Sequence, residues 1–168
     1  MCLVATWRVL RLGLFGALLS GLGLSVALAL GLADPPRHGT LYAATDALEA
    51  SLSLPRAPFT LIARGAWSAQ ASPLDSWHLV FSADGALRFT LSLHGDASFA
   101  LAPLQADSLG FIHLRRPPEP NEVLLFVTER EALLYLNREL AWRGALPDAE
   151  QVNWRGALHS ISVALYTP

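Results

Sequence analysis

Apolar and polar side chains alternate along most of the chain that follows residue 58. Trp77, Leu79 and Phe81 fall on one face of an extended segment, and the turn signal Ala83–Gly85 ends that segment. A second alternating run follows at 87–93, where Arg, Thr and Ser occupy the other face. This period of two indicates half-buried antiparallel strands.

Further short apolar runs, separated by turn signals at roughly 8–12-residue spacing, predict an all-β fold, an antiparallel β-sandwich over residues 59–168. We expect these additional strands at 97–101, 110–114, 123–127, 132–136, 139–142 and 160–166. Ten side chains should supply much of the core: Trp77, Leu79, Phe81, Leu87, Phe89, Leu91, Val123, Leu125, Leu134 and Leu136.

The N-terminal part of the chain has a different pattern. The 22 residues Leu12–Ala33 carry no charge and include nine Leu. As a helix they would span roughly 33 Å, enough for a hydrocarbon core of about 30 Å. Residues 1–33 are therefore predicted to form a cytoplasmic tip and one transmembrane helix. Arg8 and Arg11 precede the apolar run, which places the C-terminal domain outside the cytoplasm in a single-pass cell-membrane protein.

A cleaved signal peptide is the alternative, because Ala27–Ala29 and Gly31–Ala33 offer small residues at cleavage positions. The rest of the chain would then be secreted. Residues 34–58 are interpreted as a linker and the entry to the domain, and 40–54 could be either a short helix or a first strand pair.

Composition narrows the classes of function. The chain has 168 residues with a formal net charge of -2, which argues against a nucleic-acid partner. A single Cys excludes an intramolecular disulfide and Cys-rich zinc sites. The five His show no paired ligand spacing, so we expect no metal site and no cofactor. Small residues at Ala17, Gly21 and Ser25 would permit weak self-association through the helix.

The order of features over residues 59–168 resembles the concanavalin A-like and laminin-G-like jelly-roll domains. The residues that carry the resemblance are Ser76–Phe81 with Asp84–Gly85 and Arg88–Phe89, then Pro120–Leu125, then the hairpin Leu134–Leu140. The resemblance implies a jelly-roll sandwich behind the membrane anchor. Members of this fold include carbohydrate binders and glycosidases.

Two copies of one pentapeptide form the candidate binding site. Trp-Arg-Gly-Ala-Leu begins at Trp142 and again at Trp154. Indole faces stack on sugar rings, and guanidinium groups donate to hydroxyls or carboxylates. Trp142, Arg143, Trp154 and Arg155 are therefore the predicted ligand-binding residues. A structural role for the same residues, with both indoles covering the edge of the core, is the competing interpretation.

Catalytic residues are not expected. Glu129 and Glu131 are two positions apart, but they lie in a predicted turn without a third acid. The sequence therefore favours a membrane-anchored, extracytoplasmic, non-catalytic binding or interaction module, with carbohydrate as one candidate ligand. Its partners would be membrane lipid through residues 12–33 and a glycan or an envelope protein. A cell-surface glycoside hydrolase or lyase, and a structural accessory subunit of a membrane complex, are the alternatives.

Overall fold

The computed structural model describes residues 39–104 and 113–168. These residues form an antiparallel two-sheet sandwich, which confirms the predicted all-β class. The strands are β1 (Thr40–Thr45), β2 (Ser51–Ser53), β3 (Phe59–Trp67), β4 (Ser76–Ala83), β5 (Ala86–His94), β6 (Phe99–Ala102), β7 (Asn121–Val127), β8 (Ala132–Leu136), β9 (Glu139–Gly144), β10 (Gln151–Gly156) and β11 (Leu158–Thr167).

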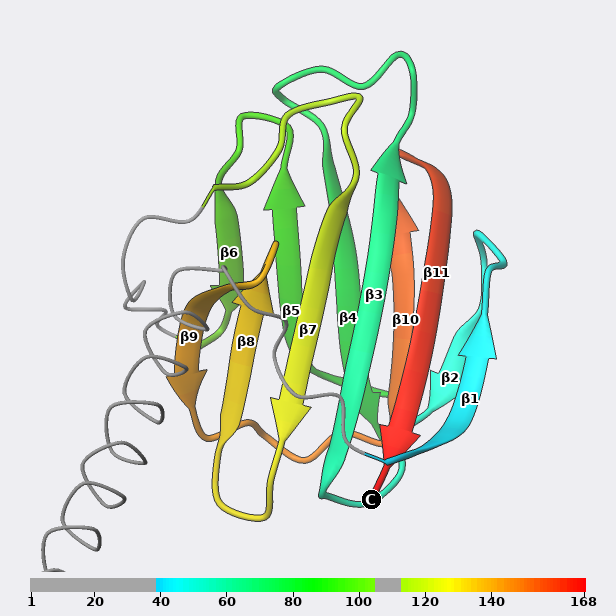
Figure 1. The fold of residues 1–168 in the computed structure, drawn as a ribbon, viewed down its shortest axis with the longest axis vertical. Helices are drawn as coiled ribbons and strands as arrows, with labels where there is room; N and C mark the ends of the chain where they lie inside the picture. Colours follow the sequence, from blue (N-terminus) through cyan, green and yellow to red (C-terminus); the bar gives the residue numbers. More distant parts are fainter. Residues whose placement is uncertain (1–38, 105–112) are drawn as a thin grey trace, which may run out of the picture.

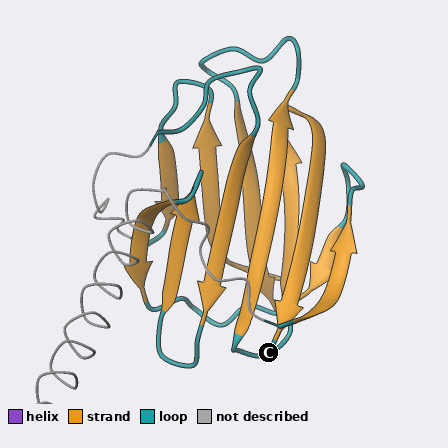
Figure 2. Ribbon diagram, viewed as in Figure 1, coloured by secondary structure: helices purple, strands orange, loops and turns teal. Residues whose placement is uncertain are grey.

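The strands form two layers. One sheet has six strands in the order β1-β11-β3-β7-β8-β9, and the other has five in the order β2-β10-β4-β5-β6. The six-stranded sheet lies in front in Figure 1 and the five-stranded sheet behind it. Figure 2 shows that loops and turns make all the connections within the described residues.

The core lies between the layers because alternate residues of each strand point inward. Trp77, Leu79 and Phe81 on β4 are almost fully buried, as are Val123 and Leu125 on β7. The predicted turn after β4 is also confirmed: Asp84 and Gly85 both have positive φ, at 51° and 72°. This backbone matches the twist of the two strands that it joins.

One predicted core residue is wrong. Leu87 is 64% exposed, although strict alternation would place it inward with Phe89. Phe81 pairs with Phe89 but Ser82 pairs with Leu87, so Arg88 is an extra residue on β5. This β-bulge moves Leu87 to the other face.

Two strands of the sandwich precede residue 59, within the range interpreted as a linker and the entry to the domain. Segment 40–54 forms strands and no helix, but its two strands join different sheets. β1 pairs with β11, and β2 pairs with β10. The range 34–58 therefore contains an edge strand of each sheet.

Two further differences concern single strands. β10 was not predicted, because only Val152 and Trp154 face inward from it. The expected strand 110–114 lies outside the described residues up to 112, and His113 and Leu114 are not in a strand.

The predicted membrane segment, residues 12–33, also lies outside the described part of the chain. Within residues 39–104 and 113–168 there is no helix with the length and apolarity needed to cross a membrane.

Candidate functional site

The two tryptophans of the predicted site belong to the core. Trp142 on β9 is 6% exposed and Trp154 on β10 is 3% exposed, and they lie in different sheets. The indole Nε1 of Trp154 donates a hydrogen bond to the carbonyl oxygen of Ala47 at 2.9 Å. Because both rings are buried, neither offers an open face to a sugar, and the structural interpretation of the repeat is the better one.

The two arginines of the predicted site are also apart. Arg143 makes a bidentate ion pair with Glu131, with Nε–Oε2 at 2.7 Å and Nη2–Oε1 at 3.0 Å. The hydrogen bonds and charge of Glu131 raise the pKa of Arg143 above its ordinary value. Arg155 lies on β10 in the other sheet. The structure therefore does not bring the four predicted residues together.

Arg155 belongs to a different cluster, on the outer face of the five-stranded sheet. Its members alternate with the buried residues of β4, β5 and β10 and carry hydroxyl, imidazole, amide or guanidinium groups. We call this surface the polar face; its side chains are Ser76, His78, Ser82, Thr90, Ser92, His94, Gln151, Asn153 and Arg155, with the apolar Val80 and Leu87 among them. None of these side chains is a carboxylate.

Strand register aligns the polar face into rows across the sheet. Arg155 lies opposite His78, and His78 lies opposite Ser92. In the next row Asn153 lies opposite Val80, which lies opposite Thr90. Directly opposite residues have Cβ atoms about 4.5–5.5 Å apart. One small ligand could therefore contact side chains from all three strands.

His78 is at the centre of a hydrogen-bonded triad on this face. Its Nε2 is 2.9 Å from Ser76 Oγ, and its Nδ1 is 2.8 Å from Ser92 Oγ. Partial burial lowers the pKa of His78 below its ordinary value of 6.5, and electrostatic repulsion from Arg155 and His94 lowers it further. The lowered pKa favours the neutral imidazole, in which one ring nitrogen is a donor and the other an acceptor.

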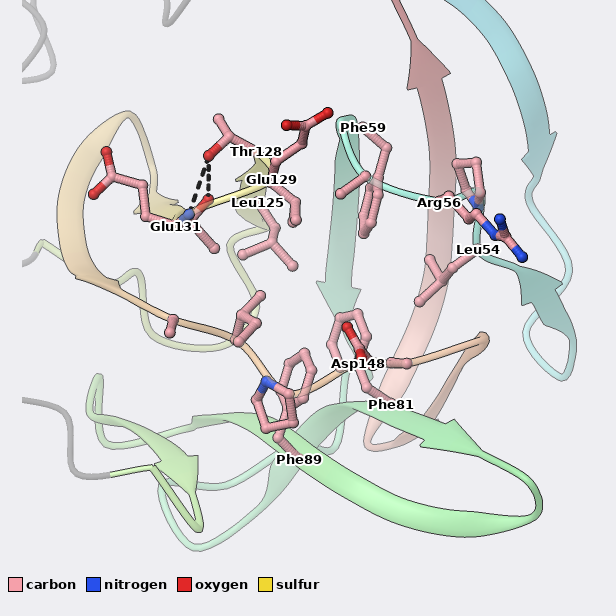
Figure 3. Close-up of a pocket in the computed structure, with 18 of the residues that line it drawn as sticks. Leu54, Arg56, Phe59, Phe81, Phe89, Leu125, Thr128, Glu129, Glu131 and Asp148 are labelled. Carbon is pink, nitrogen blue, oxygen red and sulfur yellow. Dashed lines mark hydrogen bonds between the residues drawn. The ribbon is translucent and has the colours of Figure 1, made fainter.

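The paired acids Glu129 and Glu131 lie in the β7–β8 turn, as predicted. Thr128 holds this turn, because its Oγ1 donates to the Glu131 carbonyl oxygen at 2.9 Å and accepts from the Glu131 amide at 3.1 Å. In Figure 3 the two carboxylates point in different directions, at the edge of a cavity. Since Glu131 is already paired with Arg143, these acids do not form the facing pair that glycoside cleavage needs.

Among residues 39–104 and 113–168, no group of three His, Cys, Asp or Glu side chains is placed to hold a metal ion. His113 instead contacts a carboxylate, with Nδ1 at 2.6 Å from Glu139 Oε1. The polar face itself was overlooked because sequence reasoning followed the inward residues. The polar residues at the outward positions of the same alternating runs could have indicated this surface.

Comparisons with known proteins show likeness only to solved structures; no family model and no curated protein matches the sequence. The chain is similar to sheep galectin-11 in a complex with glycerol, with 16% identity, a TM-score of 0.46, and coverage of 68% of this chain and 95% of the other. It is also similar to a human galectin-16 variant, with 12% identity, a TM-score of 0.46 and coverage of 68% and 92%. No residue role is carried over from likenesses this distant.

Proposed function

We propose that this protein is a non-catalytic binding module whose polar face takes carbohydrate, with acidic sugars preferred. The observation that carries the proposal is the row Arg155–His78–Ser92, in which three adjacent strands present hydrogen-bonding groups side by side. Sugars offer closely spaced hydroxyls that both donate and accept. Hydroxyl and neutral imidazole groups have the same dual capacity, so they suit such a ligand.

The sign of the charge on the polar face supports the preference for acidic sugars. Arg155 provides a fixed guanidinium, which pairs with a carboxylate or sulfate in a planar, two-bond geometry. No carboxylate among the outward side chains of the face competes for it. A uronic acid or a sulfated sugar would therefore gain one charge-assisted hydrogen bond that a neutral hexose lacks.

The proposal also predicts low affinity for a single site. The side chains of the polar face include no Phe, Tyr or Trp ring, so the stacking contribution of about 0.5–1.5 kcal/mol for each such ring is missing. Clustering at a surface would compensate, because a second binding event on the same polymer then occurs at high effective concentration. Membrane anchoring through residues 12–33, which belongs to the same proposal, would provide such clustering.

The test is a glycan array followed by calorimetry on the full-length protein. Arg155→Ala should weaken binding of an acidic oligosaccharide by tenfold or more, since hydrogen bonds to charged groups contribute about 1.5–3 kcal/mol. Arg143→Ala, which removes an arginine from the other sheet, is the matched control and should leave binding unchanged. Equal losses in the two variants would contradict the proposed site.

A second measurement separates binding from catalysis. The protein should release no reducing sugar from any oligosaccharide that it binds, and the double change Glu129→Gln and Glu131→Gln should leave binding as it was. Turnover that this double change abolishes would instead support the glycoside hydrolase alternative.

A further inference from the structure

The end of the sandwich opposite the β3–β4 loop contains a cavity of about 570 Å³ between the two sheets. Three connections surround its mouth: residues 54–57 before β3, the turn 128–131 between β7 and β8, and the segment 145–150 before β10. Ligand pockets for small molecules have volumes of about 300–1,000 Å³. The cavity is therefore large enough for a ligand of that class.

The floor of the cavity is apolar and comes from both sheets. Phe81 and Phe89 form a stacked pair with ring centroids 4.0 Å apart on one side, and Phe59 and Leu125 lie on the other. Figure 3 shows these side chains below and beside the open space. A smaller apolar void of about 10 Å³ is also lined by Phe81, Phe89 and Leu125.

The charged residues of the mouth include both signs. Arg56 and Arg130 line it together with Glu129, Asp148 and Glu150, while Glu131 is paired with Arg143. Two guanidinium groups and three carboxylates nearly balance, with a small acidic excess that disfavours an anionic head group. The lining therefore favours an apolar body over a charged head group.

Hydrogen bonds between the connections hold the mouth in place. The amide of Leu54 donates to the Glu150 carbonyl oxygen at 2.7 Å, and the amide of Glu150 donates to the Ser82 carbonyl oxygen at 2.8 Å. Because these bonds fix the cavity without a ligand, little ordering is needed on binding.

We propose that this cavity binds a small, uncharged, mainly apolar molecule, such as a medium-chain alcohol or a compact aromatic compound, whose body lies against the partly exposed apolar side chains Leu54, Leu146 and Pro147. This second site is separate from the polar face: it lies between the sheets, whereas the polar face is the outer surface of one of them. Its ligand and its test are independent of carbohydrate binding.

The experiment uses a photoactivatable diazirine analogue of 1-decanol with the full-length protein in detergent, and mass spectrometry to map the labelled residues. Labelling should concentrate on segments 54–59, 125–131 and 145–150. Excess 1-decanol should reduce it more effectively than decanoate or decylammonium at the same free concentration. Stronger competition by either ion would overturn the assignment to an uncharged ligand.

The second part of the experiment fills the cavity with larger side chains. Ala57→Trp and Ala149→Trp, both at lining positions, should each lower labelling of these three segments at least tenfold. Leu74→Trp, at a residue that is 96% exposed, is the matched control and should not change it. Labelling of residues 12–33, which reports partition of the probe into the apolar segment, should be equal in all variants.

Labelling of the three segments that persists in both filled variants would overturn the proposal, as would labelling no stronger than that of exposed loops. Glycan binding by the same variants distinguishes the two sites. It should be unchanged in Ala57→Trp if the polar face takes the carbohydrate, whatever the outcome of labelling.

Discussion

At the residue scale, His78 shows how the position of a side chain in a sheet can change its pKa. Its ring is partly buried between two serine hydroxyls, and Arg155 lies opposite on the neighbouring strand. Burial and the positive neighbours both disfavour the imidazolium form, which is why the pKa of His78 is lowered.

We expect NMR titration of the His78 ring to give a pKa below 6.5, and Arg155→Gln to raise that pKa because one positive neighbour is removed. Arg143→Gln, which changes an arginine in the other sheet, should leave it unchanged. A His78 pKa at or above 6.5, or one that responds equally to both substitutions, would show that the triad does not form as described.

The lowered pKa of His78 also makes the free energy of unfolding depend on pH. The unfolded chain takes up the proton near pH 6.5, whereas the folded protein takes it up only at lower pH, so the unfolded state binds more protons between these values. The His78 contribution to the free energy of unfolding is therefore full above pH 6.5 and is lost as the pH falls toward the folded-state pKa. The difference in chemical denaturation between the parent protein and His78→Gln should shrink over that interval.

Trp154 illustrates a residue whose role sequence alone could not decide. The repeated pentapeptide is compatible with a ligand platform or a core edge, and the burial of Trp154 and its pairing with Leu79 on β4 show that the indole faces inward. Trp154→Ala should lower the free energy of unfolding by about 3–5 kcal/mol, the usual cost of deleting a buried aromatic side chain. Trp154→Phe should cost less, since it removes mainly the bond to Ala47.

Denaturant titration monitored by circular dichroism measures both effects. A loss below about 1 kcal/mol for Trp154→Ala would mean that the indole is not part of the packed core in solution.

At the element scale, strands that coincide with an alternating or continuous apolar run between turn signals were predictable, and the short edge strands β1 and β2 were not. β4 and β5 show alternation clearly, whereas β7 and β8 are short, nearly continuous apolar runs. The short edge strands β1 and β2 have few inward residues, and their place depends on the strand beside them. The polar face was predictable in composition, but its rows depend on register between β10 and β4, which no local pattern reports.

The bulge in β5 provides a direct test of that register. Phe89→Ala should lower the free energy of unfolding by about 3–5 kcal/mol, because Phe89 is 2% exposed and stacks on Phe81. Leu87→Ala should cost under about 0.5 kcal/mol, as expected for an exposed position. Thermal and urea unfolding of the two variants give the comparison, and equal losses would mean that Arg88 is not the extra residue.

At the scale of the whole molecule, the earlier start of the sandwich changes which part of the chain can fold. A chain that begins at Gly39 keeps both edge strands, whereas one that begins at Phe59 leaves the outer edges of β11 and β10 unpaired. It also removes Ala47, which accepts the hydrogen bond of the buried Trp154 indole. Unpaired edges are templates for association between chains.

We therefore expect residues 39–168 to unfold in one cooperative thermal transition, and residues 59–168 to aggregate or to lose several kcal/mol of stability. Light scattering and thermal unfolding followed by circular dichroism compare the two. Equal transitions would place the domain boundary at residue 59 after all.

The pairing of β1 with β11 sets how the sandwich responds to mechanical load. Thr40, at the start of the first strand, pairs with Thr167 at the end of the last, so the two ends of residues 39–168 leave from one corner. Tension between these ends acts along the interstrand hydrogen bonds and breaks them one pair at a time, because those bonds are perpendicular to antiparallel strands. The sandwich should therefore unfold at low force, with β1 separating from β11 first. It should resist a far higher force when it is pulled parallel to its strands, because many hydrogen bonds must then break together.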